Sequence, residues 1–85
     1  MLYRLEITKL AKKELNKLSE KYREKIMQQF IFLTADPFIG KKLKGAYEGF
    51  YSLRVWPYRA IYEIDKKVIT IYVVKVEHRQ GVYNN

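Results

Sequence analysis

Three stretches in the second half of the chain alternate between apolar and polar residues with the period of a β-strand. They cover residues 50–55, 58–64 and 68–76, with turns between them at residues 56–57 and 65–67. Connections this short join neighbouring antiparallel strands, because a parallel crossover needs about a dozen residues or more. The last stretch is apolar on both faces, which is typical of a strand inside a sheet. The sequence therefore predicts an antiparallel meander of three strands.

The first half of the chain predicts one strand and two helices. Residues 2–7 alternate like a short strand, and Thr8 is a suitable N-cap for the helix that follows. Apolar residues then recur every three or four positions over residues 9–18, and a second helical pattern begins at residues 19–21. This pattern ends at Asp36, because a residue that precedes proline is pushed out of the helical region. The connection is so short that the two helices should be antiparallel neighbours.

The order β-α-α-β-β-β predicts an α+β fold, with two antiparallel helices packed on one face of a small, mainly antiparallel four-stranded sheet. We expect a single domain over residues 1–85, because a second hydrophobic core would not fit in a chain of 85 residues. Residues 38–48, between the second helix and the meander, have the composition of a loop and carry Lys41, Lys42 and Lys44. These lysines form either a solvated loop or a basic edge that faces phosphate.

The chain carries a formal net charge of +8, a large excess for a protein of this size. Such a charge favours nucleic acid, an anionic membrane surface or an acidic protein as partner, although a basic domain can also use its charge for nothing specific. The absence of cysteine excludes disulfides and thiolate metal sites. No segment is long and apolar enough to span a bilayer. We therefore expect a soluble cytoplasmic protein with no membrane partner.

Strand alternation sorts the side chains of the meander onto two faces. Tyr62 belongs to the apolar side, which we expect to pack on the helices. Arg54 and Arg59 then emerge together on the opposite face, and Arg79 at the end of the last strand can join them. The simpler alternatives are that Arg59 only pairs with Glu63 and that Arg54 is an ordinary solvated edge residue.

The carboxylates that a metal-dependent nuclease needs are not clustered in this sequence, since Glu63 and Glu77 stand alone and Asp65 lies in a turn. We therefore expect no metal and no other cofactor. Guanidinium groups match the geometry of phosphate, and aromatic rings can stack on an unpaired base. A cluster of arginines and tyrosines thus suits a site that holds and cuts a phosphodiester. The single histidine, His78, is either structural or a group that moves protons near neutral pH.

Two stretches of the chain are similar to a known family. The stretch LRVWPYRAIYEID (residues 53–65) and the ending VEHRQGVY (residues 76–83), together with the order β-α-α-β-β-β, resemble the RelE/ParE superfamily of type II toxin–antitoxin toxins. The resemblance covers nearly the whole chain. For RelE-like members it implies an mRNA interferase that cleaves mRNA in the ribosomal A site. The 2′-hydroxyl attacks the adjacent phosphate without a metal, which leaves a 2′,3′-cyclic phosphate and a 5′-hydroxyl.

The resemblance also implies roles for individual residues, which together make up the predicted catalytic set. Arg59 matches the arginine that stabilises the scissile phosphate, and Arg54 holds a position that is basic in the family. Arg79 matches a phosphate contact or general acid. Tyr83 matches the near-terminal tyrosine that stacks on or orients the substrate, and His78 stands where some members have an acid–base histidine.

Ser52 departs from the RelE pattern, because RelE itself has a lysine at this position. A serine cannot replace lysine as a charge or as a proton carrier at neutral pH. We predict that Ser52 contacts RNA together with Lys41, Lys42 and Lys44.

Two other functions are compatible with the same resemblance. ParE-like members inhibit DNA gyrase with the same fold, and an inactive toxin acts only with its antitoxin as a repressor. The near-terminal Tyr83 favours a RelE-like function, because ParE-like chains usually lack this tyrosine. Ser52, which stands where RelE has a lysine, is the reason to retain the inactive-toxin alternative. Each alternative implies a cognate antitoxin as partner, and the toxin–antitoxin complex can bind its operator DNA. The nuclease alternative adds the ribosome and mRNA.

Overall fold

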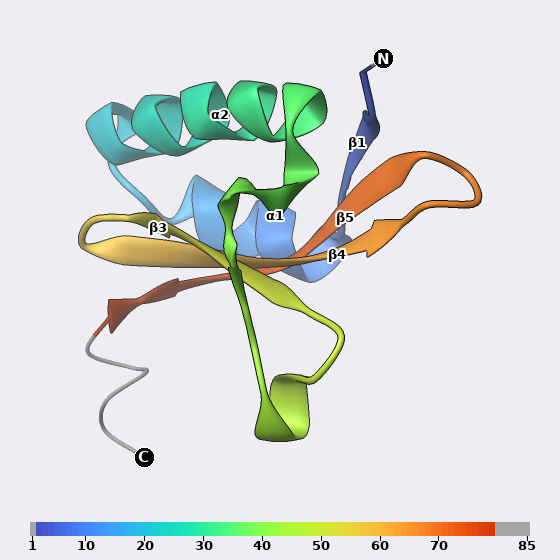
Figure 1. Cartoon of the computed structure of the whole chain (residues 1–85). Helices are drawn as coiled ribbons and strands as arrows, with labels where there is room; N and C mark the ends of the chain where they lie inside the picture. The colour runs from blue at the N-terminus through green and yellow to red at the C-terminus, as the bar shows by residue number, and fades with distance from the viewer. Residues whose placement is uncertain (1, 80–85) are drawn as a thin grey trace.

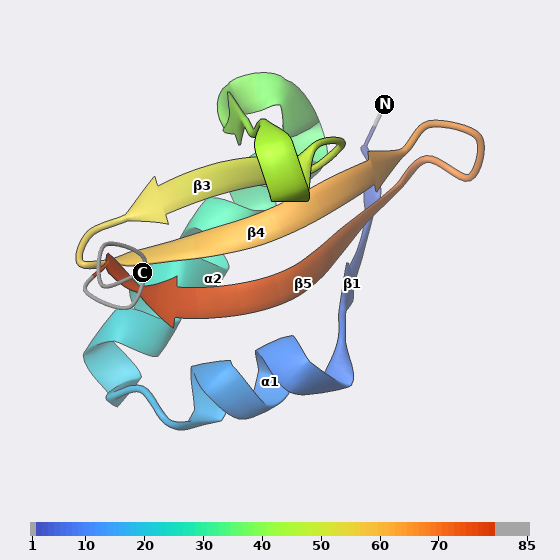
Figure 2. The same ribbon diagram turned by 90° about the horizontal axis from the view of Figure 1, so that it is seen from below.

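The computed structural model describes residues 2–79, whose strands form one sheet with the two long helices on one side (Figure 1). In chain order the elements are β1 (Arg4–Ile7), α1 (Lys9–Asn16), α2 (Glu20–Ala35), the short 3-10 helix η1 (Pro37–Ile39), β2 (Lys41–Lys42), the 3-10 helix η2 (Gly45–Tyr47), β3 (Tyr51–Val55), β4 (Tyr58–Asp65) and β5 (Thr70–His78). The strand order across the sheet is β1-β5-β4-β3-β2. β1 pairs with β5 in parallel, and the other three pairs are antiparallel (Figure 2).

The predicted α+β class, with both helices on one face of a mainly antiparallel sheet, is confirmed, and so is the interior position of β5. The predicted number of strands is wrong, because the sheet has five strands rather than four. The additional strand is β2, which lies inside the predicted loop and pairs Lys41 with Ser52 and Lys42 with Tyr51. A strand of two residues is too short to show any alternation, so nothing in the sequence marks it.

The helix boundaries follow local capping. The backbone N–H of Ala11 donates to Oγ1 of Thr8 over 3.2 Å, which starts α1 at the predicted place. α2 ends at Ala35, and the carboxylate of Asp36 then accepts a hydrogen bond from the N–H of Phe38 over 3.2 Å. The chain runs in opposite senses along α1 and α2, as predicted (Figure 1). Neither helix is long and apolar enough to cross a membrane.

One hydrophobic core joins the two helices to the sheet. Its buried members on the helices are Ala11, Leu15, Ile26, Phe30 and Leu33, and those on the strands are Leu53, Val55, Ala60, Tyr62, Ile71, Val73 and Val76. Alternate residues of β3 and β4 therefore face the helices, as the sequence predicts. The residues between them point to the other face of the sheet, where η2 lies (Figure 1).

Tyr62 anchors the segment that leads into β2. Its side chain is fully buried, and its hydroxyl donates to the carbonyl oxygen of Pro37 over 2.7 Å and accepts from the N–H of Gly40 over 3.1 Å. Burial raises the pKa of Tyr62 to about 12, so the phenol stays neutral. A Cβ at position 40 would collide with this hydroxyl and would lie 2.9 Å from the carbonyl oxygen of Ser52. Only glycine fits there, because any larger residue would push the chain away from Tyr62 and Ser52. The close approach lets β2 pair with β3.

We expect Gly40→Ala to lower the free energy of unfolding by about 1–3 kcal/mol, because the added methyl overfills a packed site. Urea denaturation followed by circular dichroism measures this change. Lys42→Ala is a matched control on the neighbouring strand, since Lys42 is exposed and its truncation should change stability by less than about 0.5 kcal/mol. Equal midpoints for Gly40→Ala and the wild type would show that the segment is not held tightly at this point.

Candidate functional site

The pairing register places Arg54, Arg59 and Glu77 in one row across three strands. Arg54 lies opposite Arg59, and Arg59 lies opposite Glu77. Directly opposed residues of an antiparallel pair share a face, and this row alternates with the buried residues of the same strands. The three side chains therefore lie on the face that the helices leave uncovered. The predicted convergence of Arg54 and Arg59 agrees with this register.

A second row on the same face runs beside the first. Lys41 lies opposite Ser52, Ser52 opposite Ile61, and Ile61 opposite Lys75. Ile61 is fully buried although it does not belong to the helix-side core, so this face has an apolar centre among its polar side chains.

The two rows meet in a groove of about 540 Å³ at the β2–β3 end of the sheet. Lys41, Ser52, Arg54 and Arg59 line it with their polar side chains, and Ile39, Gly40, Leu43 and Leu53 complete its walls. The groove thus combines three cations and a hydroxyl with an apolar wall. Two residues predicted to be catalytic and two predicted to bind RNA share this groove.

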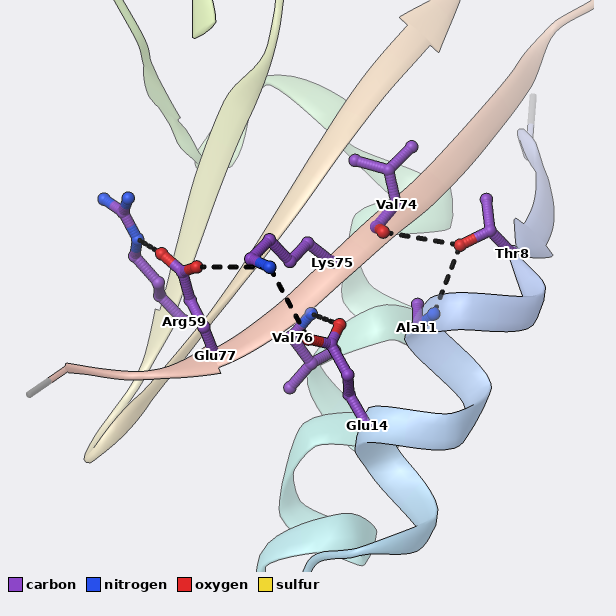
Figure 3. Close-up of polar contacts among 8 residues, drawn as sticks. All are labelled: Thr8, Ala11, Glu14, Arg59, Val74, Lys75, Val76 and Glu77. Atoms are coloured by element: carbon purple, nitrogen blue, oxygen red, sulfur yellow. Dashed lines mark hydrogen bonds and ion pairs between the residues drawn. The ribbon is translucent and has the colours of Figure 1, made fainter. Parts of the chain in front are cut away.

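Glu77 does not stand alone, contrary to the expectation from the sequence, but lies among these cations. Its Oε2 lies 3.0 Å from Nε of Arg59, and its Oε1 lies 3.9 Å from Nζ of Lys75 (Figure 3). The carboxylate partner of Arg59 is therefore Glu77 and not Glu63, and Glu77 is not isolated. The sequence does not reveal this pair, because the register between β4 and β5 depends on how the chain turns between them. The pair occupies only Nε, and Figure 3 shows the two terminal nitrogens of Arg59 directed away from Glu77.

Lys75 extends this network to α1 through Glu14. Nζ of Lys75 lies 3.7 Å from Oε2 of Glu14, whose Oε1 accepts a hydrogen bond from the N–H of Val76 over 2.8 Å (Figure 3). The register of β4 and β5 shifts next to Ile61, which leaves Val74 as an extra residue. Glu14 thus accepts from a backbone N–H of β5 that lies beyond the last residue paired with β1, Val73. Sequence analysis missed Glu14, whose one signal is that it is the single acidic residue of α1.

His78 is the last residue of β5, and Arg79 follows it directly. The ring of His78 packs edge-on against Tyr58 at 5.2 Å between centroids, and Tyr58 packs against Tyr22 of α2 at 5.4 Å. His78 therefore lies on the helix side of the sheet and is not brought into the groove. Arg79 reaches the turn between β3 and β4, where its Cζ lies 4.3 Å from the ring centroid of Trp56.

The remaining predicted site residues do not line the groove. Lys42 lies opposite Tyr51 and therefore points to the other face of the sheet, whereas Lys44 is exposed just before η2. Tyr83 lies outside the residues that the structure describes. Within residues 2–79, no three histidine or carboxylate side chains are gathered in a group that could hold a metal ion.

Comparison with known proteins defines the family. A family model described as the ParE toxin of the type II toxin–antitoxin system parDE matches residues 5–83. Toxin RelG of Mycobacterium tuberculosis is 31% identical over 86 residues, which span 98% of this chain and 98% of that protein.

Solved structures agree with the sequence comparison. A chain of the toxin–antitoxin complex RelBE2 from Mycobacterium tuberculosis has a TM-score of 0.83 and 30% identity, over 93% of this chain and 100% of that chain. A chain of the archaeal RelE–RelB complex from Pyrococcus horikoshii has a TM-score of 0.80 and 28% identity, over 93% of this chain and 97% of that chain. The chain therefore belongs to the RelE/ParE family and is a toxin of a type II toxin–antitoxin system.

Proposed function

We propose that this toxin is a ribosome-dependent mRNA endonuclease. The observation that carries the proposal is the cross-strand pair of Arg54 and Arg59, which lines a groove together with Lys41 and Ser52 on the uncovered face of the sheet. Guanidinium groups on adjacent strands suit a phosphodiester, because each presents a planar fork of donors to phosphate oxygens.

In the proposed reaction the 2′-hydroxyl of a ribonucleotide attacks the adjacent phosphorus, and the 5′-oxygen of the next nucleotide leaves with a proton. The products are a 2′,3′-cyclic phosphate and a 5′-hydroxyl, and no metal is needed. Arg54 and Arg59 stabilise the negative charge that builds on the phosphorane oxygens. Such electrostatic stabilisation by fixed donors is usually the largest single contribution to the rate enhancement. Arg79 and Tyr83 complete the proposed contacts with the substrate.

The proposed path of the RNA follows the cationic side chains beside this pair. Lys41 and Ser52 line the groove itself, and Lys44, exposed on the segment next to it, contacts the flanking backbone. Lys42 points to the other face of the sheet and lies off this path. His78 packs against Tyr58 on the helix side, so we assign it a structural part.

We further propose that a cognate antitoxin neutralises the toxin in the cytoplasm and that their complex binds operator DNA. Two of the similar structures are complexes of a toxin with its antitoxin. The net charge of +8 favours an acidic partner. Co-expression with the neighbouring reading frame, followed by affinity purification, should recover a stable complex.

Mapping of mRNA 5′ ends after induction in cells tests the nuclease function. The wild type should produce new 5′-hydroxyl ends within coding regions, and the double variant Arg54→Ala, Arg59→Ala should not.

A ParE-like function is the second candidate, because the matching family model is that of the ParE toxin. Inhibition of gyrase in a supercoiling assay, with mRNA left intact, would replace the nuclease proposal with this alternative.

Glu77→Gln should tighten the binding of single-stranded RNA about threefold to tenfold, because it removes the negative charge 3.0 Å from Nε of Arg59. The plot of log affinity against log salt should become steeper by about 0.7, as expected for one additional effective cation on a single strand. Fluorescence anisotropy of a labelled oligoribonucleotide at several KCl concentrations measures both quantities. Glu63→Gln makes the same charge change at an exposed position of β4 and controls for net charge. If both variants gain affinity equally, Glu77 has no local effect.

A further inference from the structure

Trp56 is an exposed aromatic side chain between the two strands that carry Arg54 and Arg59. It lies in the turn between β3 and β4, and 55% of its surface is accessible. The guanidinium carbon of Arg79 lies 4.3 Å above the centre of its ring, within the range of a cation–π contact. The N–H of Arg79 also donates to the carbonyl oxygen of Pro57 over 2.8 Å, which fixes the end of β5 beside this turn. The ring is thus held in place and still open to a ligand.

The position of Trp56 relates it to the arginine pair. Trp56 follows Arg54 by two residues and begins the turn that joins β3 to β4, and Arg54 lies opposite Arg59 on these two strands. The indole therefore belongs to the turn that comes directly after the strand end carrying Arg54. A phosphate held by Arg54 and Arg59 would therefore bring a neighbouring base to the indole ring.

The surroundings of Trp56 favour a nucleobase over a protein side chain. Residues that dominate protein interfaces are normally surrounded by contacts that exclude water. Trp56 is instead exposed and has the charged guanidinium of Arg79 on its ring, whereas two of the most exposed apolar side chains, Ile31 and Phe32, lie on α2. Isolated aromatic rings among cations are typical of surfaces that bind single-stranded nucleic acid.

We propose that Trp56, with Arg79 stacked on it, is the platform on which an unpaired RNA base stacks while Arg54 and Arg59 hold the adjacent phosphate. This inference rests on the proposed RNA substrate and adds a base-binding site to it. The base extends the column of guanidinium and indole, and every base has a face that can stack, so the platform contributes affinity with little sequence preference.

The chain offers a direct probe, because Trp56 is its one tryptophan. Titration of the wild type with a short single-stranded oligoribonucleotide at low salt should quench the tryptophan emission. An oligomer of the same length and charge that lacks the bases should bind the arginines and leave the emission nearly unchanged. Equal quenching by both oligomers would overturn the platform, because the effect would then arise from phosphate alone.

Affinity gives the second measurement. Trp56→Ala should weaken the binding of a labelled oligoribonucleotide about tenfold, and Trp56→Phe should weaken it less, because a smaller ring still stacks. Phe32→Ala is the matched control, since Phe32 is 61% exposed on α2 and its truncation should leave the affinity unchanged. Thermal melting of each variant confirms that it is folded.

The outcomes separate the platform from the proposed function. RNA binding that Trp56→Ala leaves intact, but that Arg54→Ala abolishes, overturns the platform and leaves the nuclease proposal standing. Failure of the wild type to bind either oligomer rejects the RNA substrate and the platform with it. Loss of antitoxin binding in Trp56→Ala, with unchanged RNA affinity, would assign this surface to a protein partner instead.

Discussion

Arg59→Ala is expected to lower the rate of mRNA cleavage on programmed ribosomes by about 10²–10³-fold, the usual effect of removing one fixed donor to a developing negative charge. Arg59 is the central member of the row, with Arg54 on one side and Glu77 on the other. The ion pair with Glu77 uses Nε and directs the terminal nitrogens away from that carboxylate (Figure 3). The guanidinium group of Arg59 is therefore held in one orientation before the substrate binds.

Two further variants sharpen this test. Arg59→Lys keeps the charge but loses the planar fork, so its rate should fall between those of the wild type and Arg59→Ala. Lys13→Ala removes an exposed cation from α1 and should leave the rate unchanged. Cleavage by Arg59→Ala at the rate of the wild type would remove Arg59 from the mechanism.

Tyr62→Ala should remove a large share of the protein's stability, because truncation of a fully buried aromatic ring costs about 3–5 kcal/mol. A small domain has a total stability of only about 5–15 kcal/mol. Tyr62→Phe keeps the ring but removes the partner of the Pro37 carbonyl and of the Gly40 N–H. We expect this variant to lose about 1–3 kcal/mol. Urea denaturation at neutral pH gives both values, and an unchanged midpoint for Tyr62→Phe would show that the hydroxyl contributes nothing.

The same hydroxyl provides an independent readout at alkaline pH. The pKa of Tyr62 rises from 10.0 to about 12 on folding, because burial disfavours the phenolate. The folded state therefore holds the proton more tightly. The stabilisation that results is fully present below pH 10 and is lost as the pH rises from 10 to about 12. At about 1.4 kcal/mol per pKa unit, the loss is roughly 3 kcal/mol, and Tyr62→Phe should not show it.

Local patterns were enough to predict much of this fold. Thr8 caps α1, and Asp36 ends α2 because a proline follows, both of which depend on nearest neighbours in the chain. The common face of Arg54 and Arg59 follows from alternation on two strands joined by a tight turn. These features need no knowledge of distant contacts.

The features that sequence analysis missed depend on contacts between distant segments. Glu77 reaches Arg59 through the register of β4 and β5, and Glu14 reaches Val76 across 62 positions of the chain. The family resemblance assigns His78 to the catalytic set, but its ring lies on the helix side of the sheet against Tyr58. Local periodicity contains no information about such pairings.

The parallel pairing of β1 with β5 has a consequence for the order of events during synthesis. Arg4 lies opposite Thr70, so the sheet joins one of the first residues of the chain to one of the last strands. A nascent chain that ends before β5 lacks Ile71 and Val73 of the core, and Arg59 has no Glu77 opposite it. Contacts of such long sequence separation form late and slow folding. The face that carries Arg54, Arg59 and Glu77 is therefore completed only after β5 has been synthesised.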